Sequence, residues 1–390
     1  MKICLAVCEY NPLHDGHLVH LDAMRRETGC DFVAVIMSGS FTQRGEIAVM
    51  DKFTRAKHAV LSGADCVFEL PTVFATSPAE IFAKGAVGLL KNLPGEKTLC
   101  FGCESGSKED FLLAAKTLSN ESKEFKKLLK TQLNEGVSFA RAKVNALEQM
   151  ELCVDLDLLK SPNNILGVEY TAAIIDSGAD IEIAPVRRLG AGYSDHTLYE
   201  KLSSASAIRK AISEGKKSKI KSNLPKYVYD DLPDRLPSAD DLTFYSLIMS
   251  DRKRLKGIID CTEGLENRIK ALLKDSPSLS VLKEKTQTKR YTAARISRIT
   301  THSLLGISES FIRKCLRSDL YLNVLAVREG CEELLSEMRK NCRIPLITRK
   351  NDVASLTGTA LECFEKDVLA NDVYSFVTGK RTNEYMMLKI

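Results

Sequence analysis

The first 200 residues of the chain contain five short apolar segments, and longer segments with helical periodicity lie between them. The apolar segments, which are bounded by polar or turn-forming residues, are Ile3–Cys8, Phe32–Met37, Cys66–Leu70, Thr98–Phe101 and Ile181–Val186. The helical segments are His17–Glu27, Asp51–Ser62, Ser77–Lys91 and Asn163–Asp176. Alternation of this kind predicts βαβ units, and therefore an α/β fold whose mostly parallel sheet is covered by helices on both faces.

Departures from this pattern suggest how the chain is divided. A Lys-rich helical insertion is expected at about 107–150, and the helix Ser203–Ser213 closes the α/β region. Residues 230–237 then carry two prolines and four charged side chains, a composition typical of a linker. We therefore expect two domains, 1–225 and 238–390.

The second domain is expected to be mainly helical, with short strands around Ile344–Thr348 and Val373–Val377. Its charge differs from that of the first half. The net charge of +5 is the sum of −6 over residues 1–200 and +11 over residues 201–390. A basic region beside a mildly acidic one indicates an enzyme core joined to a surface that binds a polyanion.

The composition excludes several protein classes. With 44% hydrophobic and 27% charged residues over 390 positions, the chain has the make-up of a folded globular protein rather than a disordered, collagenous or coiled-coil one. No apolar run approaches the roughly 18 residues needed to span a bilayer, and the first apolar segment is too short for a signal peptide. Twelve scattered cysteines favour reduced thiols, so we expect a cytoplasmic protein. Cys100-x-x-Cys103 lacks a second ligand pair, and no metal site built from protein side chains is expected.

The first candidate for chemistry is an H-x-G-H motif, His14 to His17, directly after the first predicted strand. Gly16 lets the backbone approach a ligand closely, and the N-terminus of the new helix favours an anion. Both histidines can donate hydrogen bonds to phosphate oxygens. In open α/β sheets, ligands bind at this edge of the strands. The alternative is a histidine pair that caps the helix or binds a metal.

The second candidate lies about 190 residues further on, where Ser204, Ser206, Ile208 and Arg209 form an S-x-S-x-I-R motif at the start of a helix. Serine hydroxyls and an arginine at a helix N-terminus suit the β- and γ-phosphates of a nucleotide. Taken alone, the motif is more simply interpreted as an ordinary helix N-cap with a basic surface residue. Together and in this order, the two motifs resemble the nucleotidylyltransferase branch of the H-x-G-H superfamily, which implies a Rossmann-like catalytic domain.

Further stretches narrow the resemblance to one family. They are Met37–Glu46, Asp51–Lys52 with Arg55, Gly63–Asp65, Glu69–Pro71, Phe101–Ser105, Ser161–Gly167 with Tyr170, and Arg188–Tyr193. In this order they resemble the bacterial tRNA(Met) cytidine acetate ligases over nearly the whole chain. Departures include Ser40 in place of Asn, Phe53 in place of Trp, and Ser194 in place of His, the last of which leaves the role of the Tyr193 loop open.

This resemblance implies an enzyme that activates acetate with ATP, accompanied by Mg²⁺, to acetyl-adenylate. The acetyl group then passes to N4 of the wobble cytidine of elongator tRNA(Met). The implied catalytic residues are His14, His17, Ser206 and Arg209. The implied ATP site comprises Val7, Cys8, Glu9, Tyr10, Asn11, Pro12, His14, Gly16, His17, His20, Gly102, Asn164, Arg188 and Leu189.

Two further groups of residues are candidates for the other substrates. Arg44, Asp51, Lys52 and Arg55 are placed on the acetate side, although a charged helix N-terminus is the plainer interpretation. The densest basic run, 283–317, has nine Lys and Arg residues against two Glu. Within it we expect Lys289, Arg290, Arg295 and Arg298 to bind tRNA phosphates, or else to form a solvated helix face.

Two other functions stay open at the sequence level. A nucleotidylyltransferase that makes a dinucleotide-like cofactor would share the first half but would not need the basic helical region. A non-catalytic RNA-binding protein with a retained nucleotide fold would not need both intact motifs. The residues alone therefore indicate an ATP-using adenylyl-transfer site beside a basic surface of the size of an RNA, and the oligomeric state cannot be inferred from them.

Overall fold

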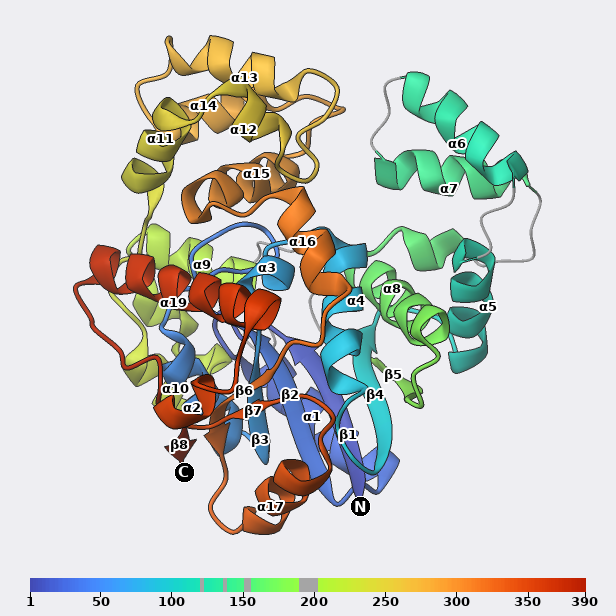
Figure 1. Ribbon diagram of the computed structural model, residues 1–390, viewed down its shortest axis with the longest axis vertical. Coiled ribbons are helices and arrows are strands. Elements are labelled where there is room, and N and C mark those ends of the chain that lie inside the picture. Colours follow the sequence, from blue (N-terminus) through green and yellow to red (C-terminus); the bar gives the residue numbers. More distant parts are fainter. Residues whose placement is uncertain (120–122, 136–138, 151–155, 189–202) are drawn as a thin grey trace.

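A single mixed β-sheet forms the centre of the molecule (Figure 1). The computed structural model describes all residues except 120–122, 136–138, 151–155 and 189–202. The strands are β1 (Lys2–Cys8), β2 (Phe32–Ser38), β3 (Cys66–Leu70), β4 (Glu96–Cys103), β5 (Glu182–Arg187), β6 (Leu322–Val327), β7 (Leu346–Ile347) and β8 (Leu388–Lys389). Their order is β5-β4-β1-β2-β3-β6-β7, and β8 also pairs with β6.

The first five strands are parallel, as the alternating pattern predicts, and they coincide with the five apolar segments. Strand β6 runs antiparallel to β3, with Cys66 opposite Val327, and β7 and β8 are parallel to β6. The predicted α/β fold with a mostly parallel sheet is therefore confirmed. An antiparallel strand at the β3 edge is the feature that the sequence did not indicate.

Helices cover both faces of the sheet. Successive side chains of a strand point to opposite sides, so an apolar strand presents an apolar surface on each face. In β1, Ile3 and Leu5 belong to one apolar core, and Cys4 and Ala6 to another. The first core is shared with α3 (Thr72–Ala75), α4 (Ala79–Leu90), α5 (Lys108–Ser119), α8 (Pro162–Ser177) and α19 (Gly358–Thr378). The second is shared with α1 (Asp15–Thr28), α2 (Lys52–Leu61), α9 (Ala205–Ser213) and α10 (Lys226–Asp231).

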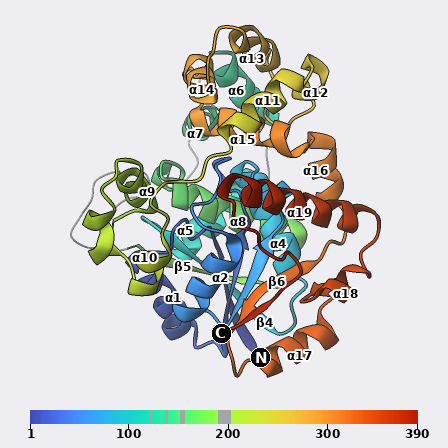
Figure 2. The ribbon, with the colours of Figure 1, turned by 90° about the vertical axis from the view of Figure 1, so that its left-hand side faces the viewer.

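A separate group of helices stands above the carboxyl ends of the strands in both ribbon views (Figures 1 and 2). It comprises α11 (Asp240–Met249), α12 (Arg252–Lys256), α13 (Leu265–Leu273), α14 (Leu279–Thr286) and α15 (Ala293–Leu305). Leu247, Leu265, Leu282 and Ile299 are among the residues of its own apolar core. We call α11–α15 the upper helical group.

The remaining helices complete the outline. They are α6 (Lys123–Asn134), α7 (Phe139–Gln149), α16 (Glu309–Leu316), α17 (Glu332–Asn341) and α18 (Lys350–Val353), with 3₁₀ segments at Leu156–Leu159 and Lys217–Asn223. Residues 107–150 thus hold the helices α5, α6 and α7. None of the helices in the described part of the chain is long and apolar enough to cross a membrane.

The C-terminal residues differ from the prediction in two ways. First, residues after 320 return to the central sheet as β6, β7 and β8, so the segment 238–390 does not form a body separate from the sheet. Second, residues 373–377, predicted as a strand, lie inside α19. Of the other predicted strand, 344–348, the pair Leu346–Ile347 forms β7. The predicted linker begins inside α10, which ends at Asp231.

Candidate active site

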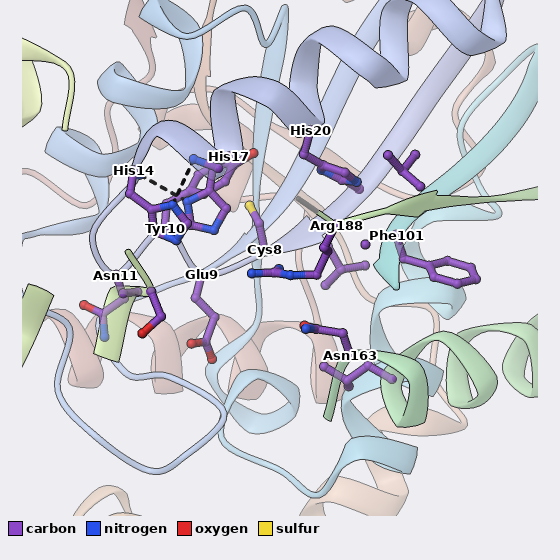
Figure 3. Close-up of a pocket in the computed structure, with 18 of the residues that line it drawn as sticks. Cys8, Glu9, Tyr10, Asn11, His14, His17, His20, Phe101, Asn163 and Arg188 are labelled. Carbon is purple, nitrogen blue, oxygen red and sulfur yellow. Dashed lines mark hydrogen bonds between the residues drawn. The ribbon is translucent and has the colours of Figure 1, made fainter. Parts of the chain in front are cut away.

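The turn between β1 and α1 forms one wall of a pocket at the carboxyl ends of the strands (Figure 3). His14 is the N-cap of α1, and its Nδ1 accepts a hydrogen bond from the Gly16 N–H at 3.2 Å. The His14 N–H in turn donates to Nδ1 of His17 at 3.2 Å. Because both Nδ1 atoms accept, each neutral ring carries its proton on Nε2. The two rings stack with centroids 3.8 Å apart, so the motif supplies two adjacent N–H donors.

The histidines of this pocket are neutral at physiological pH. Burial lowers the pKa of His14 to about 3 and that of His20 to about 4, and it lowers the pKa of His17 well below the usual value. The positive charge of Arg188 acts in the same direction on all three. A phosphate group would offset that charge, and neutral imidazoles can donate hydrogen bonds to it without bringing further charge of their own.

The opposite wall is the N-terminus of α9, which contains the S-x-S-x-I-R motif. Ser204 caps the helix by accepting from the Ala207 N–H at 3.1 Å. Arg209 donates to the carbonyl oxygen of Asn11 at 2.7 Å and to Oγ of Ser206 at 3.4 Å. The arginine of the second motif therefore holds the turn of the first, 198 positions earlier in the chain. The fold brings the two predicted motifs together around one pocket.

A half-buried carboxylate also lines the pocket. Glu9 accepts a hydrogen bond from the Gln43 N–H at 2.7 Å, and burial raises the pKa of Glu9 above the usual value. The Gln43 segment follows β2, so the ends of β1 and β2 are joined at this point. Arg55, fully buried, donates to the carbonyl oxygens of Glu9 at 2.7 Å and Ser38 at 3.0 Å. This network fixes the backbone on which Glu9 stands.

The third wall combines β4, β5 and α8. Arg188 points into the pocket (Figure 3), and its backbone N–H donates to the Cys103 carbonyl at 2.9 Å. A Cβ at Gly102 would lie 3.0 Å from Cγ of Arg188, so glycine leaves room for that side chain. Apolar side chains of Phe101 and Tyr170 lie nearby and offer a surface for a planar base.

The pocket contains most of the residues predicted for ATP and catalysis. Those that line it are Val7, Cys8, Glu9, Tyr10, Asn11, His14, Gly16, His17, His20, Gly102, Arg188, Ser206 and Arg209. Pro12 is not among the lining residues, although its cis peptide bond with Asn11 shapes the turn. Leu189 and the Tyr193 loop lie outside the described residues.

At one place in α8, the residue that lines the pocket is the neighbour of the predicted one. Asn163 lines the pocket, whereas Asn164 is buried behind it, with Oδ1 accepting from the Glu104 N–H at 2.9 Å. Its Nδ2 donates to Oγ of Ser105 at 3.0 Å. Asn164 thus holds the loop that follows β4. The pocket is also lined by residues that were not predicted for the ATP site: Ala6, Val19, Gln43, Phe82, Phe101, Asn163, Leu166, Tyr170, Val186, Arg187, Ser203, Ser204 and Ala205.

Comparison with known proteins agrees with this geometry. The sequence model of the HIGH nucleotidyl transferase family matches residues 1–387. A tRNA(Met) cytidine acetate ligase of Clostridium acetobutylicum is 36% identical over 97% of this chain and 96% of that protein. One of Clostridium perfringens is 35% identical over 100% of this chain and 99% of its own. This chain belongs to the tRNA(Met) cytidine acetate ligase family.

Solved structures extend the match to the whole fold of this ligase family. The apo crystal structure of Thermotoga maritima TmcAL aligns over 100% of both chains with a TM-score of 0.92 and 31% identity. The same protein bound with α-thio ATP aligns over 100% of both chains with a TM-score of 0.90 and 30% identity. The resemblance drawn from the motifs is confirmed, and an ATP analogue is a ligand of that structural relative.

The four charged residues predicted on the acetate side do not line the pocket, among the residues that the structure describes. Lys52 is buried and forms ion pairs with Glu69, at 2.7 Å, and with Glu384. Asp51 caps α2 and pairs with Lys380 at 2.8 Å. Arg55 supports the backbone of Glu9 and β2, and Arg44 also lies off the pocket. A direct contact of these side chains with acetate therefore has no support in the geometry.

The basic residues predicted to bind tRNA are largely engaged within the protein. Arg290 pairs with Glu263 at 2.5 Å, and Arg298 pairs with Asp260 at 3.2 Å. Arg295 donates to the carbonyl of Asp260 at 2.8 Å. These contacts organise the loop between α12 and α13. Of the four, Lys289 is exposed.

Protein side chains offer little for a metal ion. Within the described ranges no group of three or more His, Cys, Asp and Glu side chains could hold one.

Proposed function

We propose that this protein is an ATP-dependent ligase that acetylates N4 of the wobble cytidine in elongator tRNA(Met), with acetate as the acetyl source. The observation that carries the proposal is the joining of the two motifs around one pocket by Arg209, in a chain that aligns throughout with ligases of that name. ATP binding is supported by the ATP analogue bound to the structural relative.

In the first step, a carboxylate oxygen of acetate attacks the α-phosphorus of ATP, and the bond to pyrophosphate breaks. The products are acetyl-adenylate and pyrophosphate. The Nε2–H groups of His14 and His17 and the guanidinium of Arg209 offset negative charge that shifts onto the phosphate oxygens. Because the charges and dipoles are fixed before ATP binds, little reorganisation accompanies the step.

In the second step, N4 of the cytidine attacks the acetyl carbonyl, AMP leaves, and N4-acetylcytidine forms. The upper helical group stands over the strand ends, where RNA would meet the pocket (Figure 1). We place the enzyme in the cytoplasm, where tRNA is modified in bacteria. The described cysteines are all free thiols, in keeping with a reducing compartment.

Exchange of labelled pyrophosphate into ATP tests the first step. Exchange is expected to require acetate, and His17→Ala should lower its rate about 100-fold or more, as the loss of a transition-state donor does. His58→Gln, which alters a histidine of α2 outside the pocket, is the control and should keep the exchange rate. Binding of tRNA should survive His17→Ala.

The same assay separates the rival functions. Exchange that depends on a different small substrate would identify a nucleotidylyltransferase for that substrate. No exchange with any carboxylate, together with tight RNA binding, would indicate a non-catalytic RNA-binding protein. Acetate-dependent exchange without acetylcytidine in tRNA(Met), measured by mass spectrometry of the nucleosides, would refute the second step alone.

A further inference from the structure

A second cavity adjoins the candidate active site. It lies between the segment 41–49 and helices α11, α14 and α15 of the upper helical group, and its volume is about 230 Å³. Arg209 lines both this cavity and the pocket that contains His14 and His17. The two spaces therefore meet at the arginine that joins the two catalytic motifs.

The size and the walls of the second cavity suit a single planar ring. Phe41 and Ile47 of the segment 41–49, Leu236 and Leu279 supply apolar surface from three separate segments. An apolar cavity of about 150 Å³ can hold a benzene ring, so the space here is ample for a pyrimidine.

Two charged side chains give the cavity a polar pattern. Glu46 supplies a carboxylate, 3.7 Å from the guanidinium of Arg209. Lys283, on α14, supplies an ammonium group that has no hydrogen-bond partner among the described residues. Burial lowers the pKa of Lys283, whereas Asp240 and Glu46 raise it. A half-buried ammonium group without a hydrogen-bond partner has lost hydration, which costs free energy. A hydrogen bond to a ligand oxygen would offset that cost.

We infer that this cavity binds the cytosine base that receives the acetyl group, which rests on the proposed function. Cytosine carries an N4 amine that donates and an O2 that accepts. Glu46 accepts from the N4 amine and Lys283 donates to O2, while the apolar walls hold the ring. Enzymes that modify a base take it out of its stack into such a pocket. Uracil would present an oxygen to Glu46, so the carboxylate also selects cytosine against uracil.

The position of Glu46 fits the transfer step. The N4 amine lies on the Arg209 side of the cavity, next to the space for acetyl-adenylate. The bond from N4 to the acetyl carbon forms as the bond from that carbon to the AMP oxygen breaks. N4 loses one proton, which passes to the Glu46 carboxylate and then to water. No oxidant, reductant or further reactant is needed.

Lys283→Met gives the first test, with Lys285→Met, on the same helix but outside the cavity, as the matched control. Acetyl transfer is measured in a single turnover at saturating tRNA, and adenylation by pyrophosphate exchange. Lys283→Met is expected to lower the ratio of transfer to adenylation about tenfold or more. Lys285→Met should change the ratio less than twofold. Equal losses in both variants, or a change in tRNA affinity and its salt dependence alone, would show a phosphate contact and overturn the inference.

Glu46→Gln gives the second test, because the amide can keep a contact with Arg209 and can also donate to uracil. A tRNA(Met) transcript with uridine at the wobble position serves as a competitive inhibitor. The preference of the wild type for cytidine over uridine should fall about tenfold in Glu46→Gln. An unchanged preference would refute the role of Glu46. Failure of the wild type to exchange pyrophosphate with acetate would refute the proposed function instead, so the two failures are distinguishable.

Discussion

The histidines that the structure describes lie in different surroundings. His14 and His17 face a pocket, and each Nδ1 accepts a hydrogen bond from a backbone N–H. His302, in α15, is fully buried against Thr76, whose hydroxyl lies 2.9 Å from its Nε2. Burial lowers the pKa of His302 to about 3. We expect His14 and His17 to contact a ligand, whereas His302 links the upper helical group to the segment between α3 and α4.

His302 makes the stability of the protein depend on pH in a defined direction. Its pKa is about 3 in the folded protein and roughly 6.5 in the unfolded chain, so the unfolded chain binds the extra proton. The contribution of His302 is fully present above pH 6.5 and is lost as pH falls from 6.5 toward 3. The slope of the unfolding free energy against pH in this range counts the protons taken up on unfolding, and His302→Phe should lower that number by about one. Urea unfolding between pH 6.5 and 4.5 measures the slope, and an unchanged slope would contradict the assignment.

At the residue scale, the sequence predicted the motifs better than their neighbours. His14, Gly16, His17 and Arg209 carry a recognisable spacing, and the structure places them on one pocket. The choice between Asn163 and Asn164 could not be made, because adjacent helix positions face about 100° apart and either amide could serve. Lys52 resembled a substrate-binding residue because its partners, Glu69 and Glu384, lie far away in the sequence.

At the scale of elements, the segment 41–47 connects the upper helical group to the catalytic pocket. Phe41 and Ile47 form an isolated antiparallel bridge, and Thr42 and Gly45 close the turn between them. The Gly45 carbonyl accepts from the Thr301 hydroxyl at 2.8 Å. Gln43, at the same turn, donates to Glu9 in the pocket. A displacement of α15 would therefore reach the active site through one short turn.

Gly45 is required at this contact for two reasons. Its φ is +71°, and a Cβ would lie 2.5 Å from the Arg298 nitrogen and 2.6 Å from the Ser297 carbonyl carbon. Gly264, with φ of +80°, has no atom within 4 Å of the corresponding position. Gly45→Ala should therefore lower the free energy of unfolding by about 2–4 kcal/mol, against about 1 kcal/mol for the control Gly264→Ala. Chemical denaturation of both variants measures the difference, and equal losses would show that backbone conformation alone is responsible.

The sequence predicted helices and strands correctly where the tertiary packing agrees with the local hydrophobic pattern. The five parallel strands were predicted because both faces of each are buried, which leaves continuous apolar runs. The stretch 373–377 has strand-forming residues but lies in α19, since that helix packs along its length on the first core of the sheet. The pairing of β6 with β3 joins residues about 260 positions apart, and no local signal encodes it.

At the scale of the whole molecule, a buried cluster of charges joins the two ends of the chain. Lys52 contacts Glu69 from β3 and Glu384 from the C-terminal segment, and Asp367 of α19 accepts from the Tyr321 hydroxyl. Burial is the main cause that raises the pKa of Asp367 to about 7 and that of Glu384 to about 8. Glu69 and Glu384 share Lys52, and the raised pKa values mean that Asp367 and Glu384 retain protons near neutral pH.

This cluster destabilises the fold as the solution becomes alkaline. The pKa of Glu384 is about 8 in the folded protein and roughly 4.3 in the unfolded chain. The stabilisation that the protonated Glu384 gives to the fold is therefore fully present below pH 4.3 and is lost as pH rises through 8. Glu384→Gln should keep the contact with Lys52 and flatten the decline in unfolding free energy between pH 6.5 and 8. The control is Glu362→Gln: Glu362 lies on α19 and forms an exposed ion pair with Lys314 of α16, and its replacement should leave the slope as in the wild type. Urea titrations at several pH values decide between these outcomes.

The antiparallel pairing of β3 with β6 has a consequence for synthesis on the ribosome. Every described residue that lines the catalytic pocket precedes position 210, whereas the strand that covers the edge of β3 is complete only at Val327. A nascent chain therefore exposes an apolar sheet edge until more than a hundred further residues have been translated. Such an edge invites pairing with other chains. Ribosome-associated chaperones would have most to protect in this interval, when the nucleotide pocket has all its described residues and the sheet is still open.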